Sequence, residues 1–419
     1  MSPKMPRFLA SCATALVVLL NGFSAADPAA HGFDAARLKR LDAVIETEIQ
    51  GNRLAGAVMI VKRDGQDVVL KAYGKQDVEG GVEMKTDAIF RIASMSKAVT
   101  TVAALMLYEE GRFMLNDPVS KFLPEYGRSV VAVPPPPGSP ADVKYVTVPA
   151  KHPITIHNLM THTAGLTYGD FAAIEDYKKA KLYGWYLVDH DETIGEAMKR
   201  LATLPLANQP GEAFDYGFGT DLLGYLVEVV SGQPLDKFVE ERITKPLKMV
   251  DTSFYLAPEK ASRLAVVYGI EGGKLVRGED SAHSDFIHGP RKLFSGGAGL
   301  LSTASDYGRL LQMLLNDGVL DGVRLLSPRT VALMHLNHTG DLFKGEGRAF
   351  GLGFWVNQHP GDYGELVGEG AYGWGSAYFP QYFVDPKEHL VGLLMTQLRP
   401  TDGSTLNQRF KVTIYQALK

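Results

Sequence analysis

Residues 90–97 read FRIASMSK, and they join a short strand-like run to a helical pattern that ends at Gly111. Positions i and i+3 share one face of a helix, so we expect Ser94 and Lys97 to lie side by side. A serine hydroxyl needs a nearby base, and a lysine whose pKa is lowered by its surroundings can serve as one. The free N–H groups at a helix start can bind an oxyanion. The stretch predicts a nucleophile, although a capped helix with a solvated lysine fits the same short motif.

The surrounding pattern places strand-like runs near both ends of the chain and helical periodicity between them. The strand-like runs are 55–61, 67–73, 351–356, 378–384 and 390–396. The helical runs are 33–49, 94–110, 156–160, 194–204, 220–231, 235–243, 306–316 with Ser305 as its cap, and 407–418. This order predicts an α+β protein in which residues 27–95 and 270–419 form a sheet domain and residues 96–269 form a helical domain. We expect the proline-rich residues 131–140 to be a surface loop.

Composition excludes several classes of protein. Of 419 residues, 45% are hydrophobic and 21% are charged, so the chain can bury a sizeable core and is not disordered. A net charge of −4 gives no indication of a nucleic-acid partner. The single cysteine excludes a disulfide scaffold, an iron–sulfur protein and a cysteine-rich zinc site. After the first residues, no segment is long and apolar enough to span a membrane.

The first residues have the pattern of a secretory signal. Lys4 and Arg7 precede an apolar run at 8–20, and small residues at 24–26 form a cleavage site. A membrane anchor, the alternative, needs about 20 apolar residues, and this run is shorter. We therefore expect residues 1–26 to be a signal peptide cleaved near Ala26, and the protein to be periplasmic or secreted.

Four phrases, taken in order, carry a resemblance to a known family. They are FRIASMSK at 90–97, ITI at 154–156 followed by LMTHTAGL at 159–166, FDYGFGTDLLG at 214–224 and FSGGAGL at 294–300. The chain resembles the serine β-lactamase and penicillin-binding-protein superfamily, more closely its class C β-lactamase-like branch, and most closely the family VIII carboxylesterases. The resemblance implies a β-lactamase/transpeptidase-like fold, with an antiparallel sheet flanked by helices and an all-helical domain.

The resemblance also implies partners for the serine. Tyr216 matches the family's tyrosine, which faces the nucleophile and, together with Lys97, accepts and returns protons. Phe218 stands where lactamases carry an asparagine that binds substrate, so the amide for a lactam side chain is missing. This departure favours an esterase, and we expect Phe218 to line the substrate site. We expect His162 to support the loop before Gly165 rather than to act as the base.

The family's third motif has two candidates in this sequence. Trp374-Gly375-Ser376 has the expected order, although Ser376 stands where family VIII esterases typically have glycine. Its tryptophan replaces a lysine, and so supplies an apolar wall in place of a cation. The N–H groups of Ala377 and Ser94 would then form the oxyanion hole. His338-Thr339-Gly340 remains the alternative motif.

Together these features predict a serine hydrolase, a carboxylesterase that cleaves small esters through an acyl-enzyme on Ser94. The expected substrate is a small-molecule ester or β-lactam-like compound, and neither a cofactor nor a metal is required. A β-lactamase or D-alanyl-D-alanine carboxypeptidase is the first alternative, and a non-catalytic penicillin-binding-like protein is the second. The sequence does not predict the oligomeric state.

Overall fold

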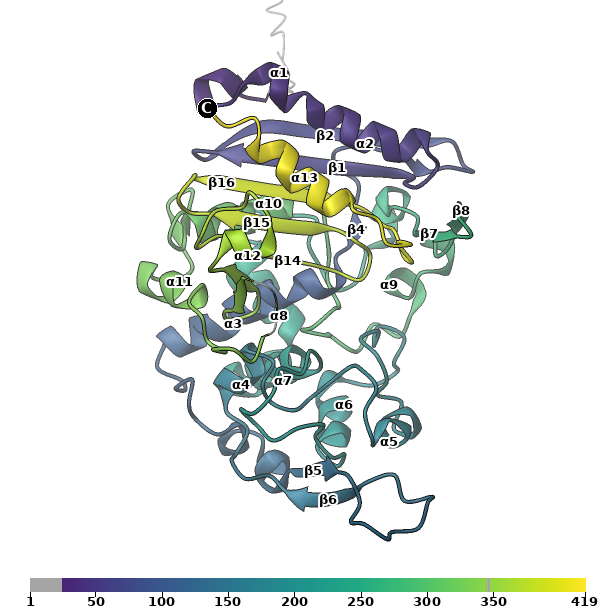
Figure 1. The fold of residues 1–419 in the computed structure, drawn as a ribbon, viewed down its shortest axis with the longest axis vertical. Coiled ribbons are helices and arrows are strands. Elements are labelled where there is room, and N and C mark those ends of the chain that lie inside the picture. The colour runs from purple at the N-terminus through teal and green to yellow at the C-terminus, as the bar shows by residue number, and fades with distance from the viewer. Residues whose placement is uncertain (1–24, 344, 346) are drawn as a thin grey trace, which may run out of the picture.

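The computed structural model describes residues 25–343, 345 and 347–419, and its largest element is an eight-stranded antiparallel sheet (Figure 1). The strands are β1 (Gly56–Arg63), β2 (Gln66–Asp77), β3 (Val82–Glu83), β12 (Arg348–Phe350), β13 (Trp355–Asn357), β14 (Tyr372–Gly375), β15 (Gln381–Asp385) and β16 (Leu390–Met395). Their order in the sheet is β12-β13-β14-β15-β16-β1-β2-β3. The neighbouring inner strands β16 and β1 come from opposite ends of the described chain, and they pair with Val58 opposite Met395. The predicted α+β class with an antiparallel sheet is confirmed.

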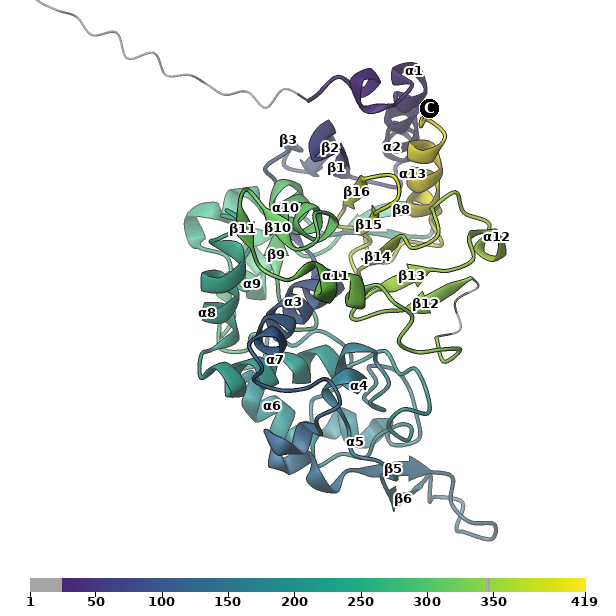
Figure 2. The same cartoon turned by 90° about the vertical axis from the view of Figure 1, so that its left-hand side faces the viewer.

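Both faces of the sheet are covered by helices (Figure 2). Val58 and Ile60 of β1 join the core cluster that contains α10 (Ala304–Leu315), whereas Met59 and Val61 join the cluster that contains α2 (Arg40–Gln50) and α13 (Leu406–Tyr415). Successive side chains of a strand point to opposite faces. A strand buried on both faces is therefore apolar along its length, as β1 is.

The lower half of the molecule in Figure 1 is mainly helical. It contains α3 (Ser96–Glu109), α4 (Ile156–Met160), α5 (Ile174–Lys179), α6 (Ile194–Leu201), α7 (Gly219–Ser231) and α8 (Leu235–Val239). Every residue of α3 from Ser96 to Leu107 is buried, and the helix packs against α7 and α8. A helix surrounded by protein on all sides holds the side chains of its first turn in place. The proposed domain boundaries at residues 95/96 and 269/270 stay a prediction.

Shorter elements connect these two parts. The helices are α1 (Ala35–Leu38), α9 (Asp285–His288), α11 (Pro328–Met334) and α12 (Pro360–Tyr363). The two-stranded pairs are β4 (Phe90–Arg91) with β9 (Leu301–Ser302), β5 (Val130–Val133) with β6 (Val146–Pro149), β7 (Tyr268–Glu271) with β8 (Lys274–Arg277), and β10 (Val319–Leu320) with β11 (Val323–Arg324). The pair β4–β9 ties the residues before Ser94 to the segment that follows residue 300.

Three local expectations are wrong. The predicted loop at 131–140 begins inside β5, because its valines pair with β6, so the helical part also carries a hairpin. The predicted strand at 351–356 begins only at Trp355, because residues 351–354 form the turn between β12 and β13, where Gly353 has a φ of 94° that favours glycine. The cap of α10 is Thr303, whose hydroxyl accepts a hydrogen bond from the N–H of Asp306, rather than Ser305.

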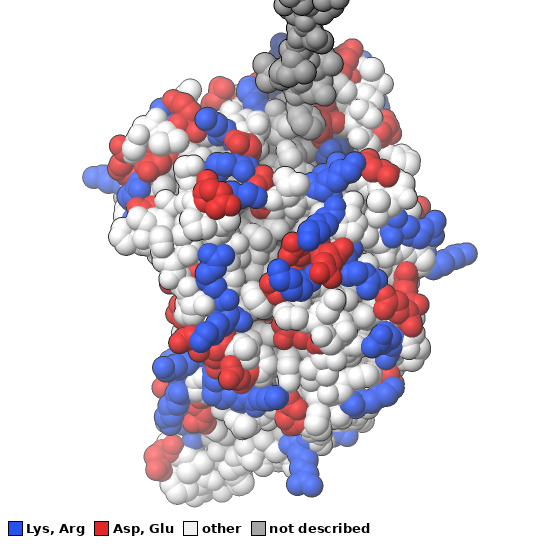
Figure 3. Space-filling model, turned by 180° about the vertical axis from the view of Figure 1, so that it is seen from behind, with Lys and Arg blue, Asp and Glu red and all other residues white. Residues whose placement is uncertain are grey.

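The surface carries both signs of charge. On the face seen from behind, basic and acidic side chains are interspersed (Figure 3). In the described part of the chain, no helix combines the length and the apolar character needed to cross a membrane. Residues 1–24, most of the predicted signal peptide, lie outside the described residues.

Candidate active site

Ser94 lies in a single 3-10 turn, Ala93–Met95, between β4 and α3. The preceding Ala93 has a φ of 37°, a left-handed conformation that is unusual for a residue other than glycine. Two contacts hold the turn in place: the hydroxyl of Tyr307 donates to the carbonyl of Met95 over 2.9 Å, and the hydroxyl of Ser96 accepts from the N–H of Leu300 over 3.0 Å. The Ser94 side chain therefore has a fixed position at the start of a buried helix.

Lys97 lies one helical turn beyond Ser94 and is fully buried. Its Nζ is 3.4 Å from Ser94 Oγ and donates to the carbonyl of Gly297 over 2.8 Å. The ammonium also lies 5.2 Å from the ring centre of Tyr168 and 4.7 Å from that of Tyr216. No ion pair to Lys97 is present among the described residues. The expected proximity of Ser94 and Lys97 is thus seen in the structure.

Tyr216 approaches from the helical part, three residues before α7 begins at Gly219. Its hydroxyl accepts a hydrogen bond from Trp374 Nε1 over 3.1 Å, so the two sides of the site are joined by this contact. Lys97 lies over the ring of Tyr216, and within the described residues no hydrogen bond connects Lys97 to the Tyr216 hydroxyl. The structure brings Tyr216 to the site, with its ring rather than its oxygen against the lysine.

His162 supports the segment that carries Tyr216. Its carbonyl accepts from the N–H of Asp215, and its Nδ1 accepts from the N–H of Gly217 over 3.4 Å. Burial, and the positive charge of Lys97, lower the pKa of His162 well below its usual range. The ring is therefore neutral, and its centre lies 4.6 Å from that of Tyr216. This geometry agrees with the supporting role expected for His162.

The two candidates for the third motif have different environments. Trp374 and Gly375 belong to β14, and with Ser376 and Ala377 they line a cavity that also contains Ser94. His338 follows α11, where its Nε2 contacts the carbonyl of Leu333 and its Nδ1 contacts His157, and it does not line that cavity. The Trp374 motif, and not the His338 motif, thus lies beside Ser94.

The backbone N–H groups of Ser94 and Ala377 have no acceptor among the described residues. Ser94 is buried and Ala377 is half-buried, and unpaired N–H groups beside Ser94 are available to a developing oxyanion. Ser376 Oγ is also buried without a partner in the described structure. These groups provide the donors that acyl transfer requires.

The cavity above Ser94 has a volume of about 420 Å³. Its lining consists of Ser94, Trp185, Tyr216, Trp355, Trp374, Gly375, Ser376 and Ala377. The chain has three tryptophans, and all three line this cavity. None of the lining residues is charged, so the site is an apolar, aromatic cleft with a nucleophile at one wall.

Comparison with known proteins agrees with this geometry. The family model Beta-lactamase matches residues 41–413. The chain belongs to the Beta-lactamase family. Esterase EstB of Burkholderia gladioli is 33% identical over 398 residues, which cover 88% of this chain and 93% of that protein. Lovastatin esterase of Penicillium rubens is 29% identical over 411 residues, which cover 90% and 98%.

A solved structure shows the same fold. EstCE1, described as a hydrolase with promiscuous acyltransferase activity, superposes with a TM-score of 0.77 at 25% identity, over 91% of this chain and 99% of that one. The predicted β-lactamase/transpeptidase-like fold is confirmed. The esterases among the relatives and the membership of the Beta-lactamase family support serine hydrolase activity.

One predicted substrate contact of this Beta-lactamase family member is absent. Phe218 is fully buried, with its ring 4.6 Å from that of Tyr168 and 6.4 Å from that of Tyr177, and it does not line the Ser94 cavity. The reason is that Phe218 directly precedes the buried helix α7, so its side chain enters the core between the helices.

Sequence analysis missed Asp221, a fully buried carboxylate on α7. Its Oδ2 accepts from the hydroxyl of Tyr168 over 2.5 Å, and its Oδ1 accepts from the hydroxyl of Ser295 over 2.5 Å and from the N–H of Gly297 over 3.0 Å. Asp221 and Lys97 are therefore connected through Gly297. The sequence did contain a signal for Asp221, an acidic residue inside the apolar run from Gly219 to Gly224. A charge buried in such a run needs compensating partners, so it indicates a buried polar network.

Proposed function

We propose that this protein is a carboxylesterase that cleaves small esters through an acyl-enzyme on Ser94. The observation that carries the proposal is the 3.4 Å approach of the buried Lys97 Nζ to Ser94 Oγ, beside a cavity with aromatic walls and no charged lining residue. The names of two relatives, esterase EstB and lovastatin esterase, support the same class.

In the proposed acylation step Lys97 reacts in its deprotonated form: Ser94 Oγ attacks the ester carbonyl carbon, and its proton passes to Lys97 Nζ. The N–H groups of Ser94 and Ala377 donate to the oxyanion while the tetrahedral intermediate exists. The bond to the alcohol oxygen then breaks, and the alcohol leaves with a proton supplied through Lys97 and Tyr216.

The proposed second half returns the enzyme to its first state. A water molecule gives a proton to the deprotonated Lys97 Nζ and attacks the acyl carbon. The bond from that carbon to Ser94 Oγ breaks, Oγ regains its proton, and the carboxylic acid leaves. Neither half requires a metal or an organic cofactor.

The lining of the cavity favours an ester over a β-lactam. A β-lactam carries a carboxylate, and a lysine on the edge strand would bind that group. Trp374 takes that place on β14, and the cavity lining contains no lysine or arginine. An apolar ester loses little hydration on entering such a cleft, whereas an anion would enter it without a partner.

The test compares p-nitrophenyl butyrate, nitrocefin and a D-alanyl-D-alanine peptide on the same protein, with Ser94→Ala as the control. We expect ester hydrolysis that Ser94→Ala abolishes, with far less turnover of the other two. Strong nitrocefin or peptide turnover without ester turnover would instead favour a β-lactamase or a carboxypeptidase. No turnover, and no labelling of Ser94 by a fluorophosphonate probe, would favour the non-catalytic alternative.

We also propose that the protein is exported, because residues 1–26 have the pattern of a cleaved signal. Fractionation of the cells that make it, followed by mass spectrometry of the N-terminus, tests this. We expect a chain that begins at Asp27 in the periplasm or the medium. A chain that retains Met1 in the cytoplasm contradicts the proposal.

A further inference from the structure

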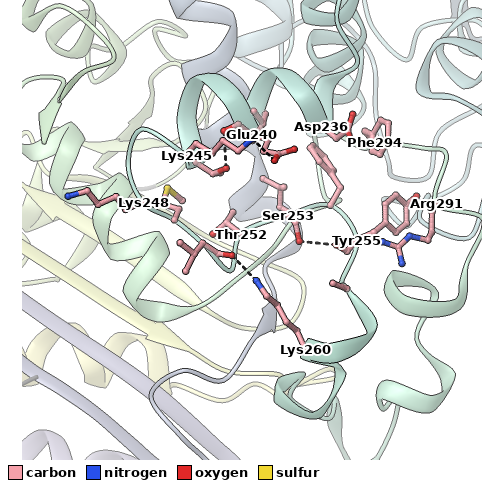
Figure 4. A pocket seen from close by; sticks show the side chains of 17 residues that line it. Asp236, Glu240, Lys245, Lys248, Thr252, Ser253, Tyr255, Lys260, Arg291 and Phe294 are labelled. Carbon is pink, nitrogen blue, oxygen red and sulfur yellow. Dashed lines mark hydrogen bonds and ion pairs between the residues drawn. The ribbon is translucent and has the colours of Figure 1, made fainter. Parts of the chain in front are cut away.

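A second cavity lies away from Ser94, between α8 and the loop at residues 291–300 (Figure 4). We call it the α8 cavity. Its volume is about 670 Å³, and none of its lining residues lines the Ser94 cavity. One wall is formed by α8 and the π-helical turn Glu240–Thr244 that follows it. Cavities of this size commonly hold small molecules, and π-helical turns are frequent at functional sites.

Aromatic side chains form the opposite wall of the α8 cavity. The ring of Phe294 lies 5.5 Å from that of Phe254 and 6.0 Å from that of Tyr255, both edge-on. Val250 is 74% exposed and also lines the cavity. Phe254 and Tyr255 are only 4% and 8% exposed, and the surface that the three rings present to the cavity is apolar and can pack against a further flat ring in an offset or perpendicular arrangement.

The charged lining residues leave one cation without an anionic partner. Three lysines of the lining are paired with carboxylates: Lys245 with Glu240 at 2.9 Å, Lys248 with Asp321 at 3.7 Å and Lys260 with Asp251 at 2.9 Å. Arg291 forms no ion pair in the described part of the chain. Its guanidinium lies 5.6 Å from the ring centre of Tyr255, and Nη1 donates to the carbonyl of Leu256 over 3.2 Å.

Arg291 is also held in an unusual backbone conformation, with a φ of 60°. Non-glycine residues occupy this region rarely, and such residues occur more often where a side chain must be placed for a ligand. Figure 4 shows the Arg291 side chain beside Tyr255 and near Phe294, at one end of the cavity. The guanidinium has five N–H donors, and a single carbonyl leaves donors free for a carboxylate.

We propose that the α8 cavity is a second binding site, for an aromatic carboxylate. The aromatic ring of the ligand packs against Phe254, Tyr255 and Phe294, and its carboxylate receives hydrogen bonds from Arg291. Of the four cationic side chains that line the cavity, only Arg291 has no carboxylate partner among the described residues, so it is the cation available to an anion. This site contrasts with the Ser94 cavity, whose lining has no charge.

The test measures binding of 2-naphthoate to the full chain by isothermal titration calorimetry. The key variant is Arg291→Gln, and the matched control is Lys292→Gln, an adjacent exposed cation that pairs with Asp191 and does not line the cavity. We expect Arg291→Gln to weaken binding of 2-naphthoate about tenfold or more, because a charge-assisted hydrogen bond is lost. We expect Lys292→Gln to leave the affinity unchanged. We expect the uncharged 2-naphthamide to bind the original protein no more tightly than 2-naphthoate binds Arg291→Gln.

Three results overturn the proposal: no binding of 2-naphthoate, equal effects of the two variants, or equal affinity for the acid and the amide. Because a carboxylate could also enter the Ser94 cavity, the titration is repeated with Ser94→Phe, which fills that cavity. We expect Ser94→Phe to bind 2-naphthoate with unchanged affinity. Loss of binding in this variant would show that the ligand occupies the Ser94 cavity and would overturn the proposal. These measurements need no hydrolytic activity, so their outcome is independent of the proposed esterase function.

Discussion

At the scale of single residues, a few neighbours fix the position of Ser94, the proposed nucleophile. Ala93 adopts the left-handed φ that turns the chain from β4 into α3, and Lys97 then faces Ser94 from one turn further along. Gly297 accepts from Lys97 and is itself held by Asp221. The position of the amine therefore depends on contacts from three segments that are far apart in the sequence.

Replacing Lys97 tests its role as the base. In Lys97→Met a side chain of similar length fills the space, so we expect the fold to persist while kcat/KM for p-nitrophenyl butyrate falls about 1,000-fold, within the range for a lost general base. The control is Lys199→Met, which removes an exposed lysine of α6. Retained activity in Lys97→Met, with an unchanged melting temperature, would exclude this role.

Asp221→Asn tests the buried network. The amide presents an NH2 group where a carboxylate oxygen accepted a hydrogen bond, so one of its donors loses its acceptor. We expect the free energy of unfolding to fall by about 1–3 kcal/mol, as for other unsatisfied buried groups. Asp221 acts through Gly297 and Lys97, so kcat should fall while KM is kept. Urea unfolding and steady-state kinetics measure both effects.

The exposed Asp189→Asn is the matched control for this substitution. It makes the same chemical change at a side chain that is 53% exposed, and we expect no effect on stability or kcat. If Asp221→Asn is as stable and as active as this control, Asp221 does not hold the site.

At the scale of elements, the walls of the Ser94 cavity come from separate parts of the fold. Trp374 lies on β14 and Trp355 on the neighbouring β13, whereas Trp185 lies in the segment between α5 and α6. Trp374 also donates to Tyr216, so a strand of the sheet and the loop before α7 meet at the cleft. The cleft exists only because the sheet and the helices are packed together.

Because all three tryptophans line this cavity, their fluorescence reports on it directly. We expect a saturating, non-quenching ester such as ethyl butyrate to reduce acrylamide quenching of the emission of Ser94→Ala, since the ester excludes the quencher from all three indoles. Stern–Volmer slopes with and without the ester measure this. Equal slopes at saturation would show that esters do not occupy the cleft.

For the whole molecule, buried histidines contribute to how stability responds to mild acid. Burial lowers the pKa of His157 to about 4, with His338 adding to the effect, and burial also lowers the pKa of His335. The pKa of His162 is lowered well below its usual range, by burial and by the positive charge of Lys97. Below the ordinary histidine pKa the unfolded chain binds protons that the folded chain does not. Stability is therefore lost as the pH falls through this range.

The effect is measurable at His162. We expect the free energy of unfolding to decrease, from this residue alone, by up to about 1.4 kcal/mol per pH unit below pH 6.5. Urea unfolding of the original protein and of His162→Gln, at pH 7.5 and 5.5, gives the difference. The control is His283→Gln, whose side chain is 81% exposed. A pH dependence that is identical in all three proteins would contradict the expectation.

The sequence alone was sufficient wherever the information is local. The α+β class, the central strands near both ends and the helix that starts near Ser94 follow from apolar periodicity, which depends on neighbouring residues. Ser94 and Lys97 are adjacent for the same reason, because three residues of helix bring them to one face. Tyr216 and Trp374 required the family resemblance, since no local pattern relates residues so far apart.

Only the tertiary structure decided the rest of the site. It chose between Trp374 and His338, added Asp221, Trp185 and Trp355, and moved Phe218 from the expected site into the core. Local pattern does not show which face of an apolar segment meets which partner, because that depends on how whole elements pack against one another. The nucleophile is thus determined by one turn of helix, whereas its cleft is determined by the packing of the sheet against the helices.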